Sequence, residues 1–211
     1  MKIFAHRGWS VGEKENSLSS FQKAVENGVD GIEIDVRWSP NKDRLIISHD
    51  PDISGEALGL EEGLIFLSDK NLDILVEMKE YDEKLFLQMV DLFKKYSLKE
   101  KIVVFGFKKV AKKFPWGKTD IKLGIISIFP WSIRSDIKKF NPSFVLMGWD
   151  YNWWTRPLFK MVWTFLSLSN LCKNNKETCF VVGIANCEAD YNWLCKQNGL
   201  YCCTVDKPFE W

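Results

Sequence analysis

Short apolar runs alternate with longer amphipathic segments along most of the chain. The apolar runs predict β-strands over residues 3–5, 32–38, 74–77, 102–105, 121–126, 144–147, 180–182 and 201–205. Between them, apolar residues spaced three and four apart predict helices over residues 17–27, 81–96, 108–114, 132–140, 157–168 and 188–197. The pattern therefore predicts about eight strands, most of them separated by helices.

A further apolar run, residues 45–47, breaks this alternation. Only the short polar linker 40–43 and its flanks separate it from strand 32–38. A parallel return needs about a dozen residues, so these two runs are predicted to form an antiparallel hairpin. The returning segment would bring His49 near the level of Asp35.

Strands that alternate with helices predict an α/β fold, the (β/α)₈ TIM barrel, as a single domain over residues 1–211. The hairpin is an extension after the second strand. The alternative, an open doubly wound sheet, expects a glycine-rich first turn, and residues 6–9 do not provide one. In a barrel, polar groups at the C-terminal ends of the strands gather on one rim.

Composition limits the class of protein further. The chain has 211 residues, 46% hydrophobic and 27% charged, which suits one domain with a sizeable core. A formal net charge of +1 gives no electrostatic case for nucleic-acid binding. No signal peptide is expected before His6, and the longest apolar stretch, 158–168, is shorter than the roughly 20 residues that cross a bilayer. We therefore expect a cytoplasmic protein whose six cysteines are reduced.

Charged side chains fall near the C-terminal ends of the predicted strands. Glu33 and Asp35 share one face of the second strand, because residues two apart point to the same side, and Glu77 lies on the next barrel strand. Three carboxylates on neighbouring strands offer oxygen ligands for one hard divalent cation, Mg²⁺ or Ca²⁺. Arg7 and Lys79 lie at the same rim and can hold phosphate oxygens, Arg as a fork and Lys as a point charge.

The only two histidines of the chain, His6 and His49, follow apolar runs at this rim. An imidazole titrates near neutral pH, so one can accept a proton while the other donates one. Phosphodiester cleavage needs both steps. A single histidine at a strand end is usually structural, but the joint placement with the carboxylates favours catalysis. We predict that the two imidazoles face each other across the cation.

Several short motifs occur in a fixed order. They are His6-Arg7-Gly8, Glu15-Asn16-Ser17, Ser20-Phe21 with Ala24, Gly31 to Val36, His49-Asp50, Glu77-Met78-Lys79 and, in part, Val205-Asp206-Lys207-Pro208. Together they resemble the signature of the glycerophosphodiester phosphodiesterase family. The first fifty residues match densely, and the remainder matches in element order and a few anchors.

The resemblance implies a TIM barrel in which the three carboxylates bind one divalent cation and the two histidines form the acid–base pair. It puts Arg7 and Lys79 on the phosphate and makes Asn16 a positioning residue for the substrate. The implied reaction is attack of a glycerol hydroxyl on phosphorus, giving a cyclic phosphate that water opens. The chain departs from the family in lacking the inserted cap domain. About 25 residues between Asp50 and Glu77 leave room for a loop and one short helix.

Ten tryptophans are several times the usual share. Trp149 is predicted to form a wall of the substrate site. Four more are predicted on the rim or beside the apolar segment 157–168: Trp9, Trp38, Trp153 and Trp154. Because Trp favours interfaces, these rings predict peripheral contact with a membrane or with an acyl chain. The alternative, which we favour for Trp163 and Trp193, is that the rings pack helices against strands.

The sequence thus predicts a metal-dependent phosphodiesterase that converts glycerophosphodiesters to glycerol 3-phosphate and an alcohol. Two rivals share the site: a lysophospholipase D-like hydrolysis and a ring-closing phosphotransfer on lysophospholipids. A third, of another class, is a catalytically silent phosphate-binding module. Mg²⁺ and Ca²⁺ both stay open as the predicted cation, and so do the leaving alcohol and the oligomeric state.

Overall fold

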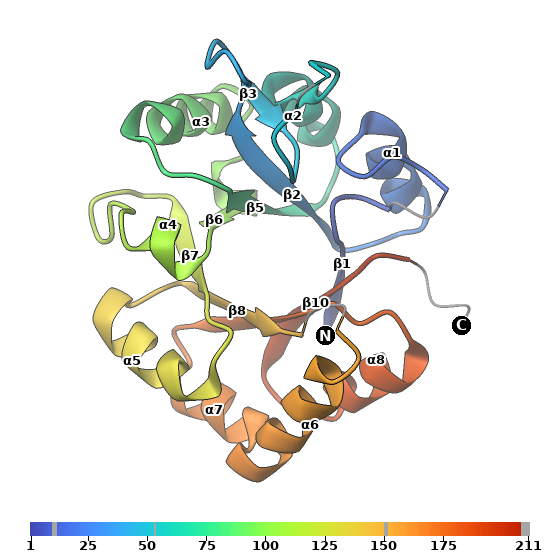
Figure 1. Cartoon of the computed structure of the whole chain (residues 1–211), viewed down its shortest axis with the longest axis vertical. Helices are drawn as coiled ribbons and strands as arrows, with labels where there is room; N and C mark the ends of the chain where they lie inside the picture. The colour runs from blue at the N-terminus through green and yellow to red at the C-terminus, as the bar shows by residue number, and fades with distance from the viewer. Residues whose placement is uncertain (10–11, 53, 150–151, 208–211) are drawn as a thin grey trace.

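Eight parallel strands close into a barrel, with the helices around its outside (Figure 1). The computed structural model describes residues 1–9, 12–52, 54–149 and 152–207. The first strand pairs in parallel with both the second and the last strand of the ring, and this closes the barrel as predicted. In order around the ring, the strands are β1 (Lys2–Ala5), β2 (Gly31–Trp38), β5 (Asp73–Met78), β6 (Ile102–Phe105), β7 (Lys122–Ile126), β8 (Phe144–Gly148), β9 (Cys179–Gly183) and β10 (Leu200–Val205).

The helices mostly fall where the hydrophobic pattern predicted them. They are α1 (Leu18–Glu26), α2 (Leu60–Ser68), α3 (Glu83–Lys95), the 3₁₀ turn η1 (Lys99–Lys101), α4 (Lys108–Ala111), α5 (Pro130–Phe140), α6 (Thr155–Leu166), α7 (Leu168–Asn174) and α8 (Glu188–Cys195). Several helix bounds lie one to three residues from the prediction. The shift is largest at α4, which is a single turn, and the helix predicted over 157–168 ends at Leu166, because Ser167 has a φ of 58° and starts α7.

The predicted hairpin after β2 is confirmed. β3 (Leu45–Ile47) runs antiparallel to β2, with Trp38 opposite Leu45 and Val36 opposite Ile47. A short strand, β4 (Leu58–Gly59), extends this ribbon by pairing with β3. Between β3 and β5, residues 54–72 contribute only β4 and α2, so this part of the chain forms no cap domain.

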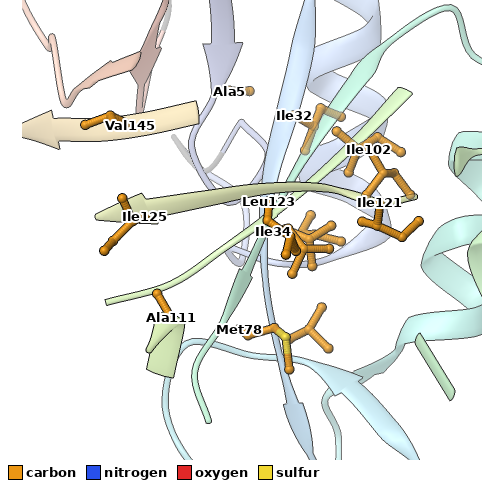
Figure 2. Close-up of a cluster of buried hydrophobic side chains, with 14 of the residues drawn as sticks. Ala5, Ile32, Ile34, Met78, Ile102, Ala111, Ile121, Leu123, Ile125 and Val145 are labelled. Carbon is orange, nitrogen blue, oxygen red and sulfur yellow. The ribbon is translucent and has the colours of Figure 1, made fainter. Parts of the chain in front are cut away.

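Two apolar layers hold the barrel together, and the alternation along each strand decides which layer a side chain joins. The inner layer consists of the inward-facing apolar residues Phe4, Leu75, Val103, Phe105, Phe144, Leu146, Val181 and Cys202. The outer layer, between strands and helices, includes Ile32 and Ile34 of β2 (Figure 2). Because Ile32 and Ile34 face outward, Glu33 and Asp35 between and beyond them must face into the barrel.

Candidate active site

Three buried carboxylates meet at the C-terminal rim of the barrel. Asp35 of β2 lies opposite Glu77 of β5 in the strand register, and Glu33 lies two residues earlier on the same face of β2. Ligand oxygens of the three side chains all lie within 4.8 Å of one another. All three residues are buried, and Asp35 Oδ1 makes no hydrogen bond. A cluster of this kind fits a hard divalent cation, which would coordinate this oxygen and offset the charge.

Burial makes this cluster electrostatically costly without a cation. Loss of solvent raises the pKa of Glu33 well above its ordinary value of 4.5, and the charges of Asp35 and Glu77 add to the rise. Burial also raises the pKa of Glu77, although the ammonium of Lys79 partly opposes this. The nearby His49 opposes the rise in the pKa of Glu77 as well, more weakly. The cluster therefore favours either a proton or a metal ion over three free negative charges.

Two basic side chains border the carboxylates. Lys79 Nζ donates to Glu77 Oε1 at 2.9 Å and lies 3.3 Å from Asp35 Oδ1. Burial disfavours the charge on Lys79, but Asp35 and Glu77 outweigh it and raise its pKa. Arg7 lies with Nε 3.2 Å from Asp35 Oδ2, while its Nη1 donates to both oxygens of Glu15. Both cations thus stand at the acidic cluster, as predicted.

The turn between β1 and α1 brings Arg7 and Asn16 to the cluster. Arg7 and Gly8 have φ values of 56° and 74°, and this left-handed turn lets the Arg7 amide donate to Glu33 Oε2 at 3.1 Å. Asn16, also with positive φ, is buried and donates from Nδ2 to Asp35 Oδ2 at 3.0 Å. The backbone amide of Asn16 donates to the Arg7 carbonyl. Asn16 therefore positions an acidic ligand and the Arg7 turn together.

His6 is held by two residues from the far end of the chain. Its Nδ1 lies 2.6 Å from Asp206 Oδ1, and its Nε2 lies 3.9 Å from Glu33 Oε2. Asn186 in turn donates from Nδ2 to Asp206 Oδ2 at 2.5 Å, and the Asp206 amide donates back to Asn186 Oδ1. With Nδ1 engaged by Asp206, Nε2 is the nitrogen turned toward the acidic cluster. Sequence reasoning noted Asp206 as part of a partial motif but assigned it no role.

His49 follows β3 on the returning ribbon. The Ser48 amide donates to the Asp35 carbonyl at 2.9 Å, and Arg37 Nη1 donates to the His49 carbonyl at 3.0 Å, so His49 stands beside the level of Asp35 as expected. Its half-exposed ring has Nδ1 3.1 Å from Asp50 Oδ1. His49 lines a hollow next to Asn16, whereas His6 lines the cavity with Glu33 and Glu77. That the two imidazoles face each other stays a prediction.

The cavity at this rim has two chemically different sides. It has a volume of about 270 Å³, and His6, Glu33 and Glu77 form its polar side. The opposite side is apolar and comes from the ends of later strands: Phe105, Phe107, Ile126, Leu146, Trp149 and Ile184. Trp149 lies on this wall and packs edge-on against Phe159 of α6, with ring centroids 5.2 Å apart.

The other tryptophans divide into core and surface. Trp9 follows β1 and Trp38 is the last residue of β2, but they are only 4% and 6% exposed, because they pack in the outer apolar layer. The expectation that these two rings contact a membrane or an acyl chain is therefore wrong. Trp163 is buried and Trp193 packs against Phe159, which agrees with a packing role. Trp153 is 86% exposed. Among the described residues, no helix is both long and apolar enough to cross a bilayer.

A closed parallel barrel with a carboxylate cluster, two cations and a histidine at one rim is the arrangement of the phospholipase C-like phosphodiesterase TIM barrels. Residues 6–178 match the Glycerophosphoryl diester phosphodiesterase family, and the chain belongs to this family.

Curated relatives agree with this membership. The chain matches only about a fifth of the length of two of them. One is an uncharacterized protein from Bacillus subtilis, 47% identical over 49 residues, which are 23% of this chain and 20% of the relative. The other is a glycerophosphodiester phosphodiesterase from Bacillus altitudinis, 42% identical over 53 residues, or 25% and 21% of the two chains. A longer match, 23% identical over 186 residues, covers 66% of this chain and 74% of a glycerophosphodiester phosphodiesterase from Caldanaerobacter subterraneus.

Solved structures share the fold over nearly the whole chain. A glycerophosphodiester phosphodiesterase from Parabacteroides distasonis superposes with a TM-score of 0.76 at 19% identity, covering 97% of this chain and 92% of that one. A phosphodiesterase from Oleispira antarctica, solved with the product sn-glycerol-3-phosphate, gives a TM-score of 0.75 at 17% identity, with 99% and 94% covered. At these identities the likeness establishes the fold alone.

Proposed function

We propose that this protein hydrolyses glycerophosphodiesters to glycerol 3-phosphate and an alcohol. One observation carries the proposal: two members of a buried cluster of three carboxylates, Glu33 and Glu77, line the same cavity as His6, whose Nδ1 is engaged by a further carboxylate. The product bound to the Oleispira antarctica phosphodiesterase is glycerol 3-phosphate, which agrees with this substrate class.

Glu33, Asp35 and Glu77 are proposed to hold one divalent cation, Mg²⁺ or Ca²⁺. When bound, such a cation would polarise a phosphoryl oxygen and offset the negative charge that develops on the phosphoryl oxygens. Arg7 and Lys79 stand beside the cluster and are proposed to bind the non-bridging oxygens of the phosphate. The carboxylates now pair with Arg7 and Lys79. If a cation binds those carboxylates instead, both basic side chains can turn toward a phosphate.

His6 and His49 are proposed to carry the protons. Asp206 accepts a hydrogen bond from His6 Nδ1–H in this assignment, which leaves Nε2 free to exchange a proton with the substrate. His49, on the adjoining ribbon, would serve the opposite step. One histidine takes the proton of the attacking glycerol hydroxyl, and the other protonates the leaving alkoxide. Water then attacks the cyclic phosphate, breaks one ring P–O bond and gives glycerol 3-phosphate. Asn16 keeps Asp35 in place, and Trp149 forms the wall beside the leaving group.

The test is turnover of glycerophosphocholine by the purified protein with Mg²⁺, with Ca²⁺ or with EDTA. We expect activity that EDTA abolishes, and a loss on the order of 10²–10⁴-fold for His6→Ala and for His49→Ala. Asp35→Asn should also inactivate the enzyme, whereas Asp91→Asn, an exposed carboxylate on α3, is the matched control and should not. Retained turnover in either histidine variant would refute the acid–base assignment.

A second candidate substrate is a lysophospholipid, which the enzyme would bind while in peripheral contact with a membrane. The apolar wall of the cavity favours it, because an acyl chain can bury surface there that a choline or ethanolamine group cannot. Lysophosphatidylcholine assayed beside glycerophosphocholine decides between the two. ³¹P NMR of the product separates hydrolysis from ring-closing phosphotransfer, which leaves a cyclic phosphate. A silent binding module would turn over neither substrate.

A further inference from the structure

The outer side of α5 and α6 carries an exposed apolar surface. Ten of the thirteen large apolar side chains exposed in the described part of the chain lie between residues 107 and 166. Trp131, Trp153 and Phe165 are 77%, 86% and 83% exposed. We call this region the α5–α6 surface. It consists of Phe129, Trp131, Trp153, Leu158, Met161 and Phe165.

α6 is apolar on two sides, and only one of them has a partner in the core. Phe159 and Trp163 pack inward, whereas Leu158, Met161 and Phe165 point to solvent. A helix that covers the outside of a barrel normally presents polar side chains there. Trp131 and Arg134 of α5 join Met161 and Phe165 in lining one groove, so the surface is continuous across both helices. An exposed apolar area of this kind marks an interaction site.

The surface also lies in the basic third of the chain. Residues 107–176 hold 13 of the 29 Lys and Arg and 3 of the 28 Asp and Glu, a net charge of +10, and the rest of the chain has a net charge of −9. In Figure 1, α2 lies at the top of the barrel, α4 at the left, and α5 and α6 at the lower left and bottom, across the barrel from α2. Exposed cations of this segment include Lys109, Lys112 and Lys113, in or directly after α4, and Arg134, which lines the groove. The net charge of +1 for the whole chain does not reveal this uneven distribution of charge.

We propose that the α5–α6 surface docks on a lipid bilayer that contains anionic lipids. Tryptophan and phenylalanine side chains insert at the boundary between headgroups and acyl chains, and nearby Lys and Arg add attraction to anionic headgroups. A second copy of this chain fits less well, because two copies of the segment 107–176, each with a net charge of +10, would face each other.

Docking at this surface puts the bilayer beside the candidate active site. Ile128 and Thr155 line the cavity, and the chain neighbour of Ile128, Phe129, is exposed on the α5–α6 surface. A lipid at the bilayer surface would therefore lie next to the cavity wall. The docking itself does not depend on the proposed activity, because it needs no turnover.

The experiment is co-sedimentation of the full chain with vesicles of phosphatidylcholine, with and without phosphatidylglycerol. We expect binding to the anionic vesicles that weakens as salt increases. Trp131→Ala/Phe165→Ala should reduce vesicle affinity at least tenfold. Lys109→Glu/Arg134→Glu should also reduce vesicle affinity. We expect a loss of about fivefold or more for each positive charge removed, the factor that corresponds to about 1 kcal/mol.

The control is Ile65→Ala/Leu87→Ala, which removes two apolar side chains on α2 and α3 that are each 55% exposed. This variant should bind vesicles like the wild type. Thermal unfolding checks that each variant is folded. Wild-type protein that does not pellet with anionic vesicles overturns the proposal, and so does an equal loss in the control. Light scattering that finds a dimer dissolved by Trp131→Ala/Phe165→Ala would assign the surface to a second copy instead. Turnover of glycerophosphocholine, measured separately, tests the proposed function.

Discussion

At the scale of single residues, the contact between His6 and Asp206 joins positions 200 apart in the chain at 2.6 Å. Asn186 fixes the second oxygen of Asp206, so the carboxylate has little freedom to rotate. A carboxylate held in this way selects which nitrogen of the imidazole carries hydrogen and fixes the plane of the ring. We therefore regard Asp206 as a positioning residue for His6.

Asp206→Asn should lower kcat on the order of 10²-fold or more, with little change in KM, because Asp206 orients His6 and lines no part of the cavity. Stabilisation of the protein by the divalent cation should be retained, since the three acidic ligands are untouched. Asp50→Asn is the matched variant beside the other histidine. Asp50 is 85% exposed, so solvent weakens its effect on His49 and the change should be less than about tenfold. A raised KM with unchanged kcat for Asp206→Asn would contradict the positioning role.

At the scale of elements, the turn from β1 into α1 does more than connect them. It holds the Arg7 amide against Glu33 and, through Asn16, supports Asp35. The Ser17 side chain accepts from the Ser20 amide and caps α1 directly after this turn. The conformation of a short connection therefore fixes two of the three acidic ligands.

Gly8→Ala should destabilise the protein and impair the site. A Cβ atom at Gly8 would lie 2.4 Å from Ser20 Oγ, and the φ of 74° is unfavourable for alanine. The control is Gly28→Ala, which has a φ of 68° but no atom within 4 Å of the new Cβ. We expect a loss of about 1 kcal/mol for Gly28→Ala and roughly 1–3 kcal/mol more for Gly8→Ala in urea unfolding. Only Gly8→Ala should also lower kcat/KM. Equal losses would show that steric contact with α1 is unimportant.

At the scale of the whole molecule, the buried acidic cluster links stability to pH and to metal. The raised pKa values of Glu33 and Glu77 mean that the folded, metal-free protein binds more protons than the unfolded chain above pH 4.5. The free energy of unfolding in EDTA should therefore fall as pH rises from 4.5 through the raised values. A bound divalent cation should remove most of this loss by stabilising the folded state.

Glu33→Gln tests this link. In EDTA at neutral pH the variant should unfold at a higher temperature than the wild type, by about 2–4 °C for each kcal/mol of repulsion removed. It should gain much less from added Mg²⁺ or Ca²⁺. Glu62→Gln, an exposed carboxylate on α2, should match the wild type in both conditions. A lower unfolding temperature for Glu33→Gln in EDTA would mean that the charge of Glu33 is satisfied without a cation.

Local periodicity was enough to predict the barrel and its acidic rim. Ile32, Glu33, Ile34 and Asp35 alternate strictly, so their outward and inward faces could be assigned from the chain alone. The hairpin after β2 followed from a linker too short for a parallel return. These features depend on neighbours within a few residues, and for that reason they carry over from sequence to structure. That residues 1–211 form one domain stays a prediction.

Features that depend on distant contacts or unusual backbone were missed. The partnership of His6 with Asp206 requires the barrel to be closed, and nothing near either residue signals it. The break between α6 and α7 rests on a positive φ at Ser167, a residue without a strong preference for that conformation. Trp38 ends β2 and Trp9 comes shortly after β1, but only the packing of the outer apolar layer decides that their rings are buried.

The pairing of the first strand with the last has a consequence for biosynthesis. β1 pairs with β2 over two residues and with β10 over four, so β1 finds most of its partners only after residues 200–205 have left the ribosome. Until then a nascent chain keeps His6 without Asp206, and the exposed edge of β1 is open to wrong pairing. Catalytic competence should therefore arrive late and all at once, and premature termination before β10 should yield inactive, aggregation-prone fragments.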